Sequence, residues 1–115
     1  MKYFSKDEFA CPCCGMNGMK QEFADKLDDA RGRAGVPFKI NSGYRCVAHN
    51  KAVGGSLTSS HLDGWAVDIE AKSSRQRFKI IEGLIGAGIK RIGIGKTFIH
   101  ADDDPDKSPE VAWLY

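Results

Sequence analysis

The sequence predicts an α+β fold in which two amphipathic helices pack on one side of a small, mostly antiparallel sheet. Apolar residues recur at helical spacing in two segments, whereas apolar and polar residues alternate over 65–70 as in a strand. A Gly-Lys pair joins two further short strands, 91–94 and 97–101, which is the pattern of a hairpin. At 115 residues the chain has room for one domain, and we expect residues 1–115 to form it.

The first elements begin and end at recognisable signals. Ser5 and Glu8 form the pattern of a capping box, which predicts a short helical turn near the amino terminus. The first long helix should run over 20–34 and end at Gly35, which is followed by a proline. Its apolar positions at helical spacing are Phe23, Leu27, Ala30 and Ala34.

The middle of the chain is predicted to be less regular. A short strand over 38–41 and a short helix over 47–53 precede a polar, irregular segment at 56–64. The second long helix should be capped by the serine pair at 73–74. The residues expected on its inner side are Phe78, Ile81, Leu84 and Ile85. The final Val-Ala-Trp-Leu-Tyr is expected to pack back on the body of the domain.

Charge and hydropathy exclude several classes of partner. The 17 basic and 15 acidic residues are interspersed and give a net charge of +2, so no basic patch predicts a nucleic-acid partner. No apolar run approaches the roughly 18 residues that span a bilayer, and the amino terminus lacks the apolar stretch of a signal peptide. We therefore expect a monomer that is made in the cytoplasm and has no membrane span.

The cysteines leave several interpretations open. Cys11, Cys13 and Cys14 crowd into one tetrapeptide, and Cys46 stands alone. Because no CxxC pair is matched by a second pair, this spacing is poor for a tetrahedral site of four thiolates. Reduced, partly buried thiols are the interpretation favoured for a cytoplasmic protein. A disulfide from the cluster to Cys46 and an accessory metal site are the alternatives.

The three histidines of the chain are His49, His61 and His100. His61 ends an irregular loop, and Asp68 lies in the strand that follows, facing away from the side occupied by Val67 and Ile69. His100 lies in the return arm of the hairpin, and pairing that arm beside the 65–70 strand would bring the two imidazoles and the carboxylate together. Such a set leaves zinc an open position for an activated water. Considered from spacing alone, a hydrogen-bonded core histidine is the alternative.

A longer motif resembles a known family. The stretch S-x-H-x-x-G-x-A-x-D, here Ser59, His61, Gly64, Ala66 and Asp68, is similar to the signature of the zinc D-alanyl-D-alanine carboxypeptidase family. Phage L-alanyl-D-glutamate endopeptidases, vancomycin-resistance dipeptidases and the Hedgehog amino-terminal domain are relatives of that family. An upstream Ser-Gly-Tyr-Arg and a downstream Phe-Ile-His-Ala-Asp also resemble its segments, in the same order.

The resemblance implies a fold, a cofactor and an activity. It implies a Hedgehog/DD-peptidase-like fold with one catalytic zinc ion held by His61, Asp68 and His100. It further implies hydrolysis of peptidoglycan stem peptides, by a carboxypeptidase or an endopeptidase, with Arg45 on the substrate or the developing oxyanion. A permanently charged planar guanidinium suits that role, although a structural hydrogen bond in a turn is the alternative. Ser59 is expected to line the substrate cleft, or else only to shape its turn.

One departure from the family pattern concerns the general base. In the dipeptidase branch an acidic residue lies three positions before the last histidine, where this chain has Thr97. Asp102 is the candidate substitute because it shares a strand face with His100; a solvated charge in an acidic run is the alternative. A zinc-containing binding module with weak or no catalysis, or a phage structural domain, therefore stays open beside a phage lytic enzyme that acts on the wall after release or export.

Overall fold

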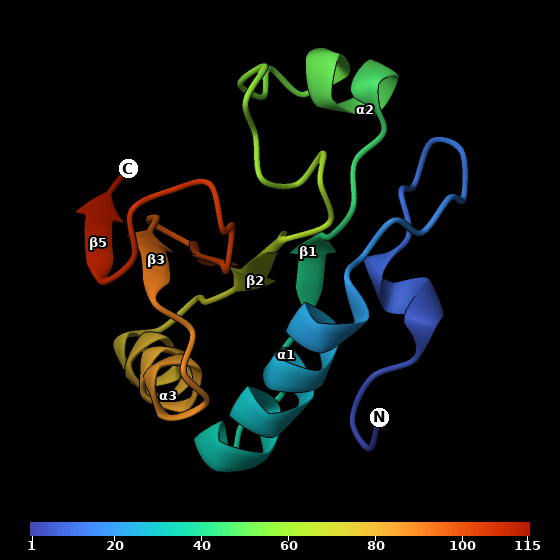
Figure 1. Ribbon diagram of the computed structural model, residues 1–115. Helices are drawn as coiled ribbons and strands as arrows, with labels where there is room; N and C mark the ends of the chain where they lie inside the picture. Colours follow the sequence, from blue (N-terminus) through green and yellow to red (C-terminus); the bar gives the residue numbers. More distant parts are fainter.

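A five-stranded sheet forms the centre of the computed structural model, which describes residues 1–115. The strand order is β1-β2-β4-β3-β5, and every neighbouring pair is antiparallel except β3 and β5, which are parallel (Figure 1). The strands are β1 (Ile40–Ser42), β2 (Ala66–Glu70), β3 (Arg91–Ile94), β4 (Phe98–Asp102) and β5 (Val111–Leu114). The predicted α+β class is confirmed.

Two long helices pack against each other beside the sheet, and two short helical segments complete the helical elements (Figure 1). The helical elements are η1 (Lys6–Phe9), α1 (Gln21–Ala34), α2 (Val47–Ala52) and α3 (Ser74–Gly86). Gly35 ends α1 in the left-handed region, and the Ser73 hydroxyl accepts a hydrogen bond from the Gln76 amide at the start of α3, as the sequence predicts.

One hydrophobic core joins the helices to one face of the sheet. The predicted inner side of α1 is confirmed, since all four of its apolar positions are buried. Val67 and Ile69 of β2 pack in the same cluster as Ile99 and Ala101 of β4. This burial determines which side of each strand faces away from the helices, and therefore where polar side chains gather.

The inner side of α3 differs from the prediction. Leu84 is buried as expected, but Phe78 and Ile85 are 63% and 59% exposed. Gly83 explains why a different side of α3 faces the core. A Cβ at this position would lie only 2.4 Å from the Ala30 carbonyl oxygen of α1. The glycine lets the two helices approach closely, so the face around Gly83 and Ile80 becomes the buried one.

The carboxyl-terminal segment adds an edge strand that the sequence did not predict. It packs back on the body as expected, but it does so as β5, in parallel with β3. Trp113 lies beside Gly93 in this pairing, and its indole stacks against the Arg91 guanidinium at 5.1 Å.

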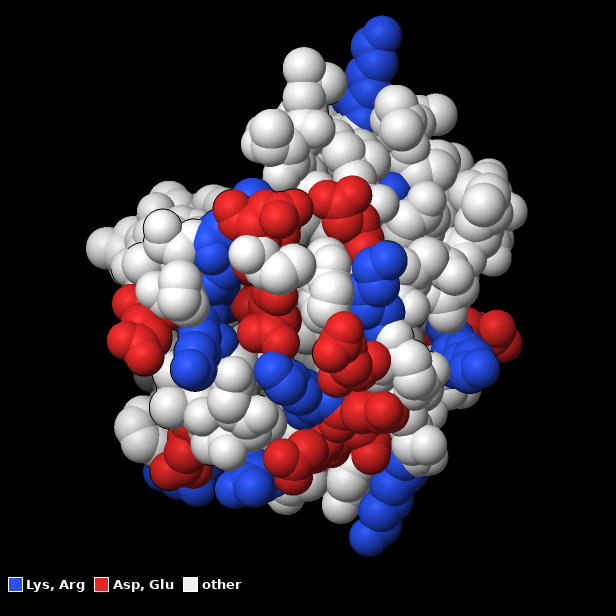
Figure 2. All heavy atoms as spheres, in the orientation of Figure 1, with Lys and Arg blue, Asp and Glu red and all other residues white.

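The surface agrees with the mixed charge of the sequence. On the face seen in Figure 2, acidic and basic side chains lie among one another rather than in separate patches. None of the helices combines the length and the apolar character that crossing a membrane requires.

We expect Gly83→Ala to lower the free energy of unfolding by about 1–3 kcal/mol, because the added methyl overpacks the α1–α3 contact. Alanine is the better helix former, so intrinsic propensity alone predicts the opposite sign. Gly86→Ala is the matched control, since a Cβ there would meet only the flexible Arg33 side chain, at 3.2 Å. Urea unfolding of both variants is the measurement, and equal midpoints would contradict the prediction.

Candidate metal centre

The pairing of β2 with β4 brings the first two candidate ligands together. Asp68 lies directly opposite His100 in the antiparallel register. Their flanking residues Val67, Ile69 and Ile99 point into the core, so period-two alternation turns Asp68 and His100 toward the other face. The juxtaposition expected for the return arm of the hairpin is therefore confirmed.

A tight loop delivers His61 to the same place. Gly64, three residues later, has φ +76°, and a Cβ there would lie 1.9 Å from the Gly18 carbonyl oxygen, so only glycine fits this turn. The His61 side chain is almost fully buried, and its Nδ1 lies 2.8 Å from the Gly43 carbonyl oxygen. Because a carbonyl oxygen only accepts, Nδ1 carries the proton and Nε2 is left free to bind a metal.

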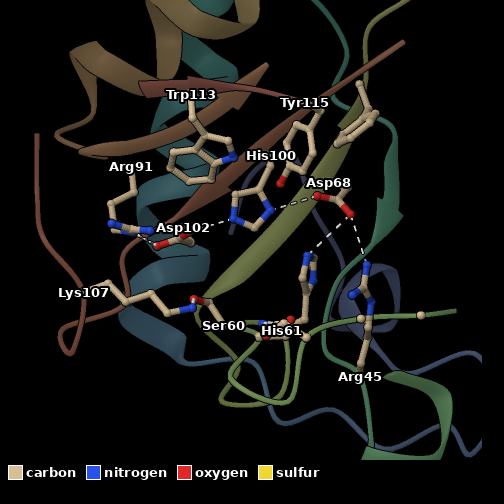
Figure 3. A pocket seen from close by; sticks show the side chains of 15 residues that line it. Arg45, Ser60, His61, Asp68, Arg91, His100, Asp102, Lys107, Trp113 and Tyr115 are labelled. Atoms are coloured by element: carbon tan, nitrogen blue, oxygen red, sulfur yellow. Dashed lines mark hydrogen bonds and ion pairs between the residues drawn. The ribbon is translucent and has the colours of Figure 1, made fainter. Parts of the chain in front are cut away.

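The three side chains converge around one point (Figure 3). His61 Nε2 lies 3.5 Å from Asp68 Oδ2, and His100 Nδ1 lies 3.0 Å from Asp68 Oδ1. One donor atom from each residue lies within 4.8 Å of the others. A tetrahedral zinc ion with bonds of roughly 2.0–2.1 Å separates its nitrogen and oxygen ligands by about 3.4 Å. The donor types and spacings thus fit zinc, with one position left for water.

Asp102 lies on the opposite side of the His100 ring from Asp68 (Figure 3). One of its oxygens accepts from His100 Nε2 at 2.7 Å, and the other accepts from Arg91 Nε at 2.7 Å. The residue is only 1% exposed, so it is not a solvated charge of an acidic run. Both oxygens of the candidate general base are therefore engaged in holding other side chains.

The charges of the cluster stabilise one another in the metal-free protein. Burial opposes ionisation of Asp68, but the hydrogen bond with His100 outweighs burial and, together with the nearby His61, holds the pKa of Asp68 well below its usual range. Burial also opposes charge on His100, but hydrogen bonds to Asp102 and Asp68 raise the pKa of that imidazole. A metal ion at Nδ1 must therefore displace a proton from His100.

Comparison with known families agrees with this donor set. Residues 2–102 match the family model described as Peptidase M15. The chain belongs to the peptidase M15 family. M15 enzymes are zinc-dependent peptidases, so the family supports a metallopeptidase with a peptide substrate. Among curated proteins, none matches the chain.

Arg45 reaches the candidate metal centre of this M15 chain from the loop after β1. Its Nη2 donates to Asp68 Oδ2 at 3.2 Å, and its Nε donates to Ser42 Oγ at 2.9 Å. Asn50 lies within 3.4 Å of Nη1, and the Arg45 side chain is only 14% exposed. The guanidinium is thus held at the metal centre by neighbouring side chains instead of extending into solvent.

The centre opens into a cleft of about 410 Å³. Ser59 lines this cleft, as the sequence predicts, and its hydroxyl also accepts a hydrogen bond from the His61 amide at 3.3 Å. The side chain therefore fits both expectations, a cleft residue and a residue that shapes its turn.

Several cleft residues of this M15 chain were missed by sequence reasoning. Trp113 lies in β5, and Tyr115 follows this strand. Their ring centroids lie 5.5 Å and 6.4 Å from the centroid of the His100 ring. Lys107 and buried Ser60 lie on another wall, where Lys107 Nζ donates to Ser60 Oγ at 2.8 Å. Only the apolar character of the terminal segment pointed to packing there, and no spacing signal marked Ser60 or Lys107.

The shifted pKa values predict how stability of the chelated protein depends on pH. The lowered pKa values of Asp68 and Asp102 give stability that is present above about pH 4 and is lost as pH falls through the folded-state values. The raised pKa of His100 gives stability that is present below about pH 6.5 and is lost as pH rises through its folded-state value.

The stability advantage of chelated wild type over chelated His100→Gln should therefore be largest between about pH 4 and 6.5 and shrink at higher pH. Urea unfolding of both proteins across this range measures the difference. A difference that stays constant with pH would show that the imidazolium contributes nothing.

Proposed function

We propose that this chain is a zinc peptidase that hydrolyses peptide bonds in the stem peptides of bacterial peptidoglycan, as a D,D-carboxypeptidase or an endopeptidase. The observation that carries the proposal is the convergence of His61 Nε2, Asp68 and His100 Nδ1 at the wall of an open cleft. Each imidazole has its second nitrogen bonded to a protein oxygen, as metal-binding histidines do.

His61, Asp68 and His100 are the proposed zinc ligands. When bound, zinc supplies a Lewis acid that activates water and polarises the scissile carbonyl. The Gly43 carbonyl fixes the tautomer and ring plane of His61, while β2 and β4 hold the other two ligands on a rigid sheet. The protein thereby keeps three donors in place without movement of the backbone.

Arg45 is the proposed substrate residue, together with Ser59. The guanidinium already lies at a carboxylate, Asp68, and it lines the cleft. A fixed planar cation there is suited to a substrate carboxylate or to the oxyanion that develops during acyl transfer. Arg91 and Lys107 also line the cleft, where they pair with Asp102 and Asp104. Stem peptides carry several carboxylates, so a guanidinium beside the metal position favours them over neutral peptides.

For Asp102 the geometry favours a positioning role over that of general base. Its oxygen holds His100 Nε2–H, which leaves Nδ1 directed at Asp68 and the metal position. Arg91 neutralises the second oxygen of Asp102. A carboxylate with both oxygens engaged in this way is suited to orienting His100 and is a poor candidate for taking a proton from water.

A second candidate function rests on the same observation. Asp68 and Asp102 are the acidic residues that line the cleft, and both are paired. With no carboxylate free for general-base work, a binding module that keeps zinc and cleaves slowly or not at all is the alternative, in a phage structural protein for example. Zinc content and binding of wall fragments with no new amino termini or released D-alanine would identify it.

The proposed setting is a monomeric phage or prophage lytic enzyme. The family and the cleft support a peptide substrate, and the proposed wall substrate lies outside the cytoplasm in which we expect the chain to be made. Release by lysis or export is therefore part of the proposal.

Replacing a ligand should remove both metal and activity. We expect His61→Ala and Asp68→Ala to lose the zinc of this centre and to lower peptidoglycan cleavage by roughly 10³-fold or more, since the activated water is lost with the metal. Release of D-alanine and of new amino termini from purified wall measures activity and separates carboxypeptidase from endopeptidase. Elemental analysis measures zinc.

His49→Ala is the matched control, because this third histidine does not line the cleft. It should keep wild-type zinc and cleavage. Full cleavage by either ligand variant, or by chelated wild type, would overturn the proposed mechanism.

Asp102→Asn separates positioning from general-base catalysis. If Asp102 orients His100, the variant should bind zinc about 10–100-fold more weakly in a chelator competition. Asp103→Asn is the control, since that neighbour instead bonds Lys26 at 2.6 Å. Unchanged zinc affinity with a large loss of turnover would assign Asp102 to the base role.

A further inference from the structure

The four cysteines lie together although they come from two distant segments. One sulfur from each residue lies within 4.8 Å of all the others. Cys11 Sγ lies 3.6 Å from both Cys13 Sγ and Cys46 Sγ, and Cys13 Sγ lies 3.2 Å from Cys46 Sγ. This cluster lies outside the cleft of the metal centre, because none of its members lines that cleft.

The sulfur spacings match those around a tetrahedral ion. Zinc–sulfur bonds of roughly 2.3 Å place the four sulfurs of such a site about 3.8 Å apart. A disulfide would require about 2.05 Å. All four thiols are free, and the spacings among Cys11, Cys13 and Cys46 are much closer to the edge of a zinc–thiolate tetrahedron than to a covalent bond.

The backbone holds these sulfurs in place. The Cys11 amide donates to the Met16 carbonyl at 2.8 Å, and the Gly15 amide donates to the Cys11 carbonyl at 2.8 Å, which closes a compact turn. Within this turn Cys11 and Cys14 have the C-x₂-C spacing common to zinc ligands. Cys46 precedes α2, and its sulfur accepts a hydrogen bond from the His49 amide at 3.4 Å.

We propose that Cys11, Cys13, Cys14 and Cys46 form a second, structural metal site that binds one zinc ion. Four thiolates complete the coordination of zinc and leave no position for water, so the site has no catalytic role. Cys11 is fully buried while Cys13 and Cys14 are exposed, which gives the ion an entry path from solvent. The cation also offsets the repulsion that four adjacent thiolates would otherwise cause.

The second zinc ion would restrict the motion of the loop at 43–46, which contacts the candidate metal centre. Cys46 follows Arg45 directly, and the Gly43 carbonyl of the same loop accepts a hydrogen bond from His61 Nδ1. The Tyr44 amide donates to the Phe9 carbonyl at 2.8 Å, so the amino-terminal segment already touches this loop. A zinc ion bound by both Cys46 and the cysteines of the turn at 11–14 would connect the two segments. This connection would limit the motion of Arg45.

The test counts metal ions in the full chain, purified with a thiol reductant. Elemental analysis should find about two zinc ions per chain in wild type, and about one in either His61→Ala or Cys46→Ser. Cobalt substitution should give intense thiolate-to-cobalt charge-transfer absorption in wild type and in His61→Ala, but not in Cys46→Ser. Met16→Ser, an exposed change within the same turn, is the matched control and should behave as wild type.

These readouts separate this site from the proposed peptidase centre. The cobalt spectrum of wild type and His61→Ala needs no cysteine variant to fold, so it decides the question even if Cys46→Ser aggregates. A wild type without a charge-transfer band would overturn the inference. So would wild-type protein purified without reductant whose cluster holds no zinc and whose cysteines resist alkylation until reduced, since that pattern marks a disulfide.

Discussion

The register of β2 against β4 is the constraint on which the candidate metal centre depends. Val67 and Ile69 on one strand, and Ile99 on the other, are buried in the core. Asp68 and His100, which are paired across the two strands, therefore both point to the opposite face of the sheet. A slip of one residue would turn His100 into that core and its apolar neighbours into the cleft. The free energy that holds the two ligands side by side therefore comes mainly from hydrophobic burial on the opposite face of the sheet.

Much of this arrangement was predictable because it depends on local periodicity. Alternation over β2 and the hairpin of β3 and β4 placed Asp68 and His100 on one face, and helical spacing identified the buried side of α1. Sequence-based prediction was wrong or silent where a contact with a segment distant in the chain determines the structure. The buried side of α3 follows from the close approach of Gly83 to Ala30, and β5 follows from pairing with β3 across the acidic segment. Neither contact leaves a periodic signal within its own segment.

Local periodicity also left part of the candidate metal centre undetermined. Period two correctly put Asp102 on the face of His100, but it did not say which ring nitrogen each carboxylate would meet. That choice determines whether Asp102 hydrogen-bonds to water in the cleft or to the His100 ring. The family match ends at residue 102, whereas Trp113 and Tyr115 enter the cleft from beyond that point. The wall of the cleft beside His100 is thus built by residues that neither motif nor family match identified.

The cysteines show what linear spacing leaves out when side chains come from separate segments. Three sulfurs in four residues look too crowded for a tetrahedron, yet a compact turn spreads Cys11, Cys13 and Cys14 around the place where Cys46 arrives. The segment 43–46 then touches both clusters: Gly43 orients His61, Arg45 bonds Asp68 and Cys46 joins the thiols. A domain this small buries only a modest core, so a structural metal is an effective way to hold such a loop rigid. A metal at the four cysteines would let the amino-terminal turn support the cleft without lining it, by limiting the motion of Arg45.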